Sequence, residues 1–186
     1  EMCIRDSIST ALAIRLGIES AARNGILVRD GATFRILEAT DAVVFNRVGT
    51  LVEPTMTVET VTAEYGEDPD LVLSVAGALS VESDHPSSRA LVKAAREARD
   101  KRDKHDGGPT WIELSQEDTT PDGAVRGRLT LTYEDQHTEN LEAILWRPTN
   151  LSQLKGRLSL AATAGGTPVV VRWKGRDRGV ITLYAV

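Results

Sequence analysis

Apolar and polar residues alternate along several segments of the second half of the chain, and this pattern predicts β-strands. The clearest segment is 124–133, where an apolar residue or a glycine stands at almost every second position. A period of two is typical of a strand that buries one face. Shorter strands are expected at 57–62, 111–114, 141–146, 169–173 and 179–184. The turn-forming residues of 121–123 are expected to precede the long strand, and those of 174–177 to join the last two strands as a hairpin.

A helical period of apolar residues predicts two helices between these strands. Asp68-Pro69 begins the first helix, whose expected buried face holds Leu71, Val72, Val75 and Leu79. Pro86 suits the first turn of the second helix, which is expected to end near Asp100. His85 would then lie at the joint of a helical hairpin. Further helices are expected at 9–24 and from a cap at Asn150 to the stop at Gly165-Gly166.

A different pattern occupies residues 41–52, around which the rest of the chain is organised. The short apolar run Ala42–Phe45 ends abruptly in polar and small residues. This pattern predicts a buried strand that opens into a loop. Catalytic groups often lie at such strand ends.

Together these elements predict an α+β fold, with an antiparallel sheet flanked by a helical hairpin. The chain has 186 residues, of which 41% are hydrophobic and 26% charged. This is enough for one good core or two small ones.

Charge and composition exclude several classes of function. A net charge of -5 argues against a nucleic-acid-binding surface, and an aromatic content of 4% leaves few platforms on which bases could stack. The single cysteine, Cys3, excludes an internal disulfide and a CxxC metal site. No segment approaches the ~20 apolar residues that span a bilayer. The longest candidate, 8–18, is shorter and carries Arg15, and no signal peptide is evident.

The first seven residues differ in character from the rest of the chain. Residues 1–7 resemble the translation of a transposase adaptor used in DNA library preparation. We interpret them as a sequencing scar, so Cys3 carries no functional meaning. The alternative interpretation, an ordinary frayed terminus, changes nothing downstream.

Residues 45–52 resemble the phosphorylation motif of P-type cation-transporting ATPases, a strand followed by D-K-T-G-T-L-T. Phe45, Gly49, Thr50 and Leu51 match the motif. The positions that differ are Asn46 for the phosphorylated Asp, Arg47 for the Lys, Val48 for the first Thr and Val52 for the last. The resemblance implies a HAD-like α/β phosphorylation domain, of which this chain would hold the first part.

The replacement at position 46 changes the expected chemistry. In the family the Asp attacks the γ-phosphoryl group of ATP, the Lys helps to neutralise it, and the Thr-Gly-Thr turn cradles it near Mg²⁺. An aspartyl-phosphate needs an anionic oxygen as nucleophile, whereas the amide of Asn46 is neutral. The candidate catalytic positions are therefore Asn46, Arg47, Gly49 and Thr50, and we expect that this chain cannot be phosphorylated.

Two further segments resemble the heavy-metal branch of that family. Residues 21–31, A-A-R-N-G-I-L-V-R-D-G, match a segment that follows a membrane helix about twenty residues before the phosphorylation motif. From the residues alone, the same segment predicts a helix, a glycine stop and a short strand. His85-Pro86 matches the E-x-x-x-E-H-P motif, with Asp84 at the second Glu and Ser80 at the first. The resemblance implies that the His orients the adenine of ATP, although an isolated His-Pro is more often a structural helix start.

The remaining family motifs are less complete. A glycine turn, G-x-G-V-x-G, aligns its end with Val125 and Gly127, which places Asp122 and Ala124 at the first two glycines. A carboxylate at the first position would repel a triphosphate, and a methyl group at the second would reduce the space. A V-G-R-P-like segment falls on 145–148, with Trp146 in place of Gly. The candidate nucleotide-binding residues are His85, Pro86, Asp84, Gly123, Val125, Gly127 and Arg147, and no metal-ligating residue is assigned.

The resemblance implies four segments in the chain. These are the scar 1–7, the end of a membrane helix and cytosolic lead-in at 8–30, the first part of the phosphorylation domain at 31–55, and the nucleotide-binding domain with its return strand at 56–186. We expect the chain to be cut at both ends, with the missing membrane and phosphorylation-domain segments belonging to the same parent. It would lie on the cytoplasmic face of a membrane protein.

The expected function is the ATP-binding region of a heavy-metal cation transporter that couples ATP hydrolysis to metal transport. ATP and Mg²⁺ are the cofactors implied by resemblance, with binding that is weak or lost, and no nucleic acid is expected as a partner. The alternative is a pseudoenzyme, an interaction or regulatory module that does not bind nucleotide.

Overall fold

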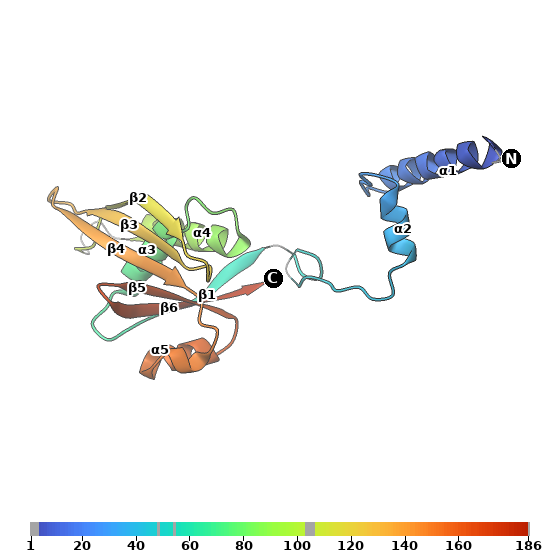
Figure 1. Cartoon of the computed structure of the whole chain (residues 1–186). Helices are drawn as coiled ribbons and strands as arrows, with labels where there is room; N and C mark the ends of the chain where they lie inside the picture. The colour runs from blue at the N-terminus through green and yellow to red at the C-terminus, as the bar shows by residue number, and fades with distance from the viewer. Residues whose placement is uncertain (1–3, 48, 54, 103–106, 186) are drawn as a thin grey trace. The chain divides into compact units, whose positions relative to one another are not determined.

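The computed structural model describes residues 4–47, 49–53, 55–102 and 107–185. They form two compact units, Glu1–Phe45 and Asn46–Val186, which are described separately. Figure 1 shows the elements of both units.

The first unit contains two helices. Helix α1 spans Ile4–Arg23 and confirms the helix expected at 9–24, which begins earlier than predicted. The chain leaves it through Gly25, whose φ of +78° favours glycine. The second helix, α2 at Ala32–Glu38, was not predicted and has no side-chain cap at its start. None of the helices in the described ranges has the length and apolar character that crossing a membrane requires.

Two strands expected in this unit are absent from the structure. The apolar run Ala42–Phe45 is extended chain with no strand pairing, and the Val44 side chain is 96% exposed. The short strand expected within 25–31 is also unpaired, and Leu27 is 88% exposed. An apolar run forms a strand only where neighbouring strands supply hydrogen bonds and a surface to bury against. Neither segment has such a neighbour among the described residues.

The second unit is built on a six-stranded antiparallel sheet with the order β1-β6-β5-β4-β3-β2. The strands are β1 Met56–Ala63, β2 Trp111–Thr119, β3 Val125–Thr132, β4 Thr138–Trp146, β5 Thr167–Trp173 and β6 Arg176–Ala185. The strands predicted for this unit are all present, most of them longer than expected. Burial alternates along β3 and β4, which confirms the period of two there, whereas β5 and β6 each bury a run of consecutive residues.

Helices cover both faces of this sheet (Figure 1). On one face α3 Pro69–Leu79 and α4 Pro86–Lys101 form the predicted helical hairpin and bury leucines, valines and alanines against the strands. On the other face α5 Gly156–Thr163 packs on alternate residues of β5 and β6, Val170 and Val180. The predicted fold class, an antiparallel sheet flanked by a helical hairpin, is confirmed.

The long helix expected after Asn150 is interrupted. Asn150 forms a capping box with Gln153, as a cap residue should, but it begins only the short 3-10 helix η1 Leu151–Gln153. Leu154 and Lys155 then adopt extended backbone, and Gly156 has a φ of +57°. This break lets Leu154 and Leu158 both reach the core under α5. The apolar residues of 151–161 keep a helical spacing across the break, so the sequence pattern did not indicate it.

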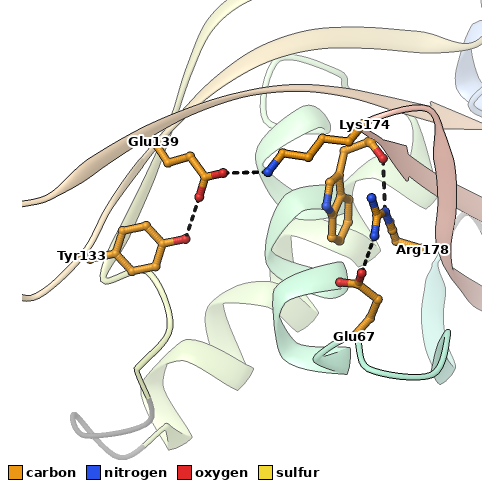
Figure 2. Close-up of polar contacts among 6 residues, drawn as sticks. Glu67, Tyr133, Glu139, Lys174 and Arg178 are labelled. Carbon is orange, nitrogen blue, oxygen red and sulfur yellow. Dashed lines mark hydrogen bonds and ion pairs between the residues drawn. The ribbon is translucent and has the colours of Figure 1, made fainter.

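At one end of the sheet, the β3–β4 and β5–β6 turns are held by charged side chains (Figure 2). Glu139 accepts hydrogen bonds from Tyr133 Oη at 3.2 Å and from Lys174 Nζ at 3.0 Å. Arg178 donates to the Trp173 carbonyl oxygen at 3.1 Å and pairs with Glu67, in the loop before α3. These contacts bind the sheet to the helical layer, and we call this region the turn end.

Candidate nucleotide-binding site

The candidate nucleotide-binding residues come from three segments near the opposite end of the sheet, called here the His85 end. β3 begins where β4 ends, because Val125 is the register partner of Leu145. The turn before β3 and the segment after β4 therefore lie at the same end. The start of α4 joins them through a hydrogen bond from Arg147 to Ser87. The structure thus brings the predicted residues His85 and Arg147 together.

His85 is the N-cap residue of α4, with Pro86 in the first helical turn. The backbone N–H of Ser87 donates to His85 Nδ1 at 3.2 Å. This contact satisfies one of the amides that a helix start leaves without an intrahelical partner. His85 therefore has the structural role of a helix start that an isolated His-Pro pattern predicts. Its Nε2 atom takes no part in this capping contact.

The Ser87 hydroxyl connects His85 to Arg147. Its Oγ lies 2.6 Å from His85 Nδ1 and accepts a hydrogen bond from Arg147 Nη2 at 2.5 Å. Burial and, to a smaller extent, the charge of Arg147 lower the pKa of His85 from its ordinary value. The imidazole is therefore held in its neutral form near pH 7. No carboxylate within the described ranges forms an ion pair with Arg147.

The predicted glycine turn has its polar groups turned inward. Gly123, with a φ of +80°, donates its N–H to the Thr120 carbonyl oxygen at 2.8 Å, and Ala124 donates to Thr120 Oγ1 at 3.1 Å. Hydrogen bonds from the Thr120 side chain and from its own backbone lower the pKa of Asp122. The turn thus presents an ionised carboxylate, and the amides of Gly123 and Ala124 are already used.

Gly127 is required by packing inside the sheet. A Cβ atom at this position would lie 2.5 Å from Leu79 Cδ2 and 2.8 Å from Leu114 Cδ1. Both leucines belong to the core beneath α3, and Leu79 is fully buried. Gly127 and the half-buried Val125 therefore serve the core, and this position does not expose bare backbone to a ligand.

The two Glu positions of the His-Pro motif, Asp84 and Ser80, are bonded to different partners, and a further acidic pair lies nearby. Asp84 is exposed and lies 3.6 Å from Arg89 in a surface ion pair. Ser80, at the first Glu of the motif, is buried and donates its hydroxyl to the Ala76 carbonyl oxygen at 2.8 Å. Burial, and then the neighbouring Glu82 carboxylate, raise the pKa of Glu117.

The candidate catalytic segment forms a separate tight turn in the same unit. Val52 N–H donates to the Arg47 carbonyl oxygen at 2.9 Å, and Gly49 N–H donates to the Val52 carbonyl oxygen at 2.8 Å. Gly49 has a φ of +86°, so glycine suits this turn. The side chains of Asn46, Arg47 and Thr50 are exposed, and Val48 lies outside the described residues.

The chain is similar in sequence to curated proteins that are described as copper-exporting P-type ATPases. The chain is 28% identical over 179 residues to the copper-exporting P-type ATPase of Vibrio cholerae, covering 95% of this chain and 18% of that protein. Over 90 residues it is 39% identical to the probable copper-exporting P-type ATPase V of Mycobacterium tuberculosis, covering 48% of this chain and 12% of that protein. The chain is a relative of the heavy-metal P-type ATPases.

Solved structures of heavy-metal P-type ATPases share the fold. The catalytic domain of the CPx-ATPase CopB-B superposes with a TM-score of 0.61 at 18% identity, covering 91% of this chain and 52% of that chain. A zinc-transporting PIB-type ATPase in its E2.Pi state gives a TM-score of 0.53 at 22% identity, covering 96% and 27%. No family model matches the sequence. The chain spans about a fifth or less of the curated relatives it matches.

The Mg²⁺ expected for a heavy-metal P-type ATPase does not fit the donors of the candidate catalytic turn. Residues 46–52 contain no carboxylate. Mg²⁺ is held in proteins by carboxylates together with substrate phosphates and water. Elsewhere in the described part of the chain, no group of three or more His, Cys, Asp and Glu side chains could hold a metal ion.

Ser87 and Glu117 were not identified from the sequence. Ser87 follows His85-Pro86 in the first helical turn, a common position for a serine, so the sequence does not indicate its contact with Arg147, 60 positions away. Glu117 belongs to an alternating strand, and only the fold reveals that it faces Glu82. The position of Ser87 close to the candidate His85 is the one signal in the sequence that could have identified it.

Proposed function

We propose that Asn46–Val186 contains the nucleotide-binding module of a heavy-metal P-type ATPase that binds ATP weakly and transfers no phosphoryl group. The parent protein would export a transition-metal cation, and this module would lie on the cytoplasmic face of the membrane. Within the chain, residues 8–30 would hold the end of a membrane helix and a cytosolic lead-in, 31–55 would be the first part of a HAD-like phosphorylation domain, and 56–186 would form the nucleotide-binding domain and its return strand.

The observation that carries this proposal is the link between two candidate residues that come from different motifs. His85 and Arg147 were selected from separate segments, and both contact the hydroxyl of Ser87. His85 Nε2 has no partner among the described residues, and Arg147 forms no ion pair there. A neutral imidazole and a guanidinium without a carboxylate can bind the polar edge of a purine.

The loss of phosphoryl transfer rests on Asn46. Its neutral amide cannot supply the anionic oxygen that forms an acyl phosphate, and the turn around it offers no carboxylate for Mg²⁺. The full-length parent should therefore take up no acid-stable radiolabel from γ-³²P-ATP. Label attached at residue 46 would contradict this part of the proposal.

Calorimetric titration of the purified chain with ATP tests nucleotide binding. We expect a dissociation constant in the millimolar range or below, and a loss of about tenfold or more for His85→Ala. His137→Ala is the matched control, because His137 is an exposed histidine at the turn end and its replacement should leave the affinity unchanged. Equal losses in both variants would argue against a site at His85.

A second candidate function is favoured by the glycine turn. The turn before β3 uses its amides internally and carries an ionised Asp122, while Gly127 serves the core. These features suit a pseudoenzyme that keeps the fold as a protein-interaction or regulatory module. Absence of ATP binding by the folded chain would support this second function over the first.

A further inference from the structure

The Ser87 hydroxyl has unusual surroundings for a serine in the first turn of a helix. Its residue is 3% exposed, and its hydroxyl lies between a ring nitrogen and a guanidinium. A buried hydroxyl is one donor and a double acceptor, so its partners decide which way its hydrogen points.

The partners of Ser87 leave one arrangement of hydrogens. Arg147 can only donate, so the Oγ atom of Ser87 must accept from Nη2. The backbone N–H of Ser87 points at His85 Nδ1, which therefore must be an acceptor. With Nδ1 as the acceptor, the hydroxyl hydrogen of Ser87 completes the chain across the 2.6 Å contact.

We propose that Ser87 is a positioning residue that holds the neutral His85 ring with its hydrogen on Nε2 and ties that ring to Arg147. Two donors meet at Nδ1, and a hydrogen on that nitrogen would remove the backbone contact and reverse the direction of the hydroxyl contact. Buried donors and acceptors that lose their partners cost more than an ordinary hydrogen bond gains, so the arrangement is specific.

This inference rests on the proposed function where it concerns the ligand. Nε2–H of His85 and the remaining N–H groups of Arg147 are all donors. The ligand group between them must then be a hydrogen-bond acceptor, such as a purine ring nitrogen or a carbonyl oxygen. A purine edge that presents only an amino group would not be recognised by this pair.

The first test is a two-dimensional ¹H–¹⁵N correlation spectrum of the histidine rings in the nucleotide-free chain. We expect His85 Nδ1 to show the resonance of a nitrogen without hydrogen, and Nε2 that of a nitrogen with hydrogen. Ser87→Ala keeps the backbone N–H but loses the hydroxyl donor, so the Nδ1 resonance should move part of the way toward the average of exchanging tautomers, whereas Ser87→Thr should restore it. A wild-type Nδ1 that carries hydrogen, or a spectrum unchanged in Ser87→Ala, would overturn the inference.

ATP titration of the same variants gives the second readout. Ser87→Ala should weaken binding about fivefold, the size of effect expected for one hydrogen bond, and Ser87→Thr should stay within about twofold of wild type. Ser88→Ala is the matched control, because its hydroxyl donates to Ser83 Oγ and does not contact His85. A loss equal to that of Ser87→Ala in this control would count against Ser87.

The two tests separate the inference from the proposed function. If the ring nitrogens behave as expected but no variant binds ATP, the positioning role of Ser87 stands and nucleotide binding fails. If wild type binds ATP and Ser87→Ala binds it equally well, nucleotide binding stands and the positioning role fails.

Discussion

The two ends of the sheet use charged side chains differently. At the turn end, Lys174 pairs with Glu139 and Arg178 pairs with Glu67, so both of these cations have a carboxylate partner (Figure 2). At the His85 end, Arg147 contacts a neutral hydroxyl, and the acidic residue of the glycine turn, Asp122, is bonded to its own turn. Both ends are built from loops of the same sheet.

This difference distinguishes charged side chains that stabilise the fold from charged side chains that remain available to bind a ligand. A cation that already has a carboxylate gains little from another anion, whereas a cation with only a hydroxyl partner retains most of its capacity to bind one. The hydrogen bond from Lys174 is the main reason why the pKa of Glu139 is lowered, which is the mark of a satisfied pair. We therefore expect substitutions at the turn end to change stability, and substitutions at the His85 end to change binding.

The largest effect is expected for Gly127→Val, which tests whether this glycine of the His85 end belongs to the core. Its side chain would overlap Leu79 and Leu114, so the free energy of unfolding should fall by about 2–3 kcal/mol. Urea denaturation followed by circular dichroism measures the change. Arg128→Val, at the next outward position of β3, is the matched control and should be close to neutral. Normal stability with lost ATP binding would instead make Gly127 a ligand contact.

Arg178→Ala should lower the free energy of unfolding by about 1–2 kcal/mol, because Glu67 is left partly buried without its cation. Thermal melting gives the effect. ATP affinity should be unchanged, since this residue lies at the turn end. Arg176→Ala, an exposed arginine of the same hairpin, provides the comparison. A change in ATP affinity would break the separation between the two ends.

Asp122→Asn should strengthen ATP binding by about twofold to threefold at low salt, because an exposed negative charge near the triphosphate is removed. The gain should shrink as salt is added. Glu134→Gln removes the same charge at the turn end and should not reproduce the gain. Unchanged binding in Asp122→Asn would place the triphosphate away from this turn.

The smallest effect concerns Glu82 and Glu117. Because the pKa of Glu117 is raised in the folded chain, its ionisation lowers stability as pH rises above the ordinary range of a glutamate. Glu82→Gln removes the neighbouring charge and should raise the free energy of unfolding by a few tenths of a kcal/mol at pH 7, after screening by solvent. The gain should vanish at low pH, where the carboxyl group of Glu117 is protonated. Urea midpoints at the two pH values measure it.

The sequence predicted correctly those helices and strands in which the spacing of apolar residues agrees with the face that is buried. The apolar residues of α3 recur with the helical period and are buried as expected, and Asp68 caps the helix in front of Pro69. Alternation along β3 likewise matches its burial. The prediction of a strand at Ala42–Phe45 was wrong because an apolar run is buried as a strand only where partner strands are available. The prediction of a continuous helix after Asn150 was wrong because a glycine at positive φ interrupts a helix without changing the spacing of the apolar residues.

The candidate site was predictable as a set of motif positions but not as a set of contacts. His85 was expected at the joint of the hairpin and lies there as a helix cap. Its hydrogen-bonded link to Arg147 depends on the register of β4 and on the buried hydroxyl of Ser87, and neither is visible in a linear pattern. The internal bonding of the glycine turn was missed for the same reason.

The pairing of β1 with β6 has a practical consequence for protein engineering. Met56 and Ala185 are register partners, so the polypeptide enters and leaves the sheet side by side. A short peptide joining these two positions would close the module into a ring, and new termini could be opened at the exposed Lys174-Gly175 turn. The same adjacency makes the module suitable for grafting into a surface loop of an unrelated host protein.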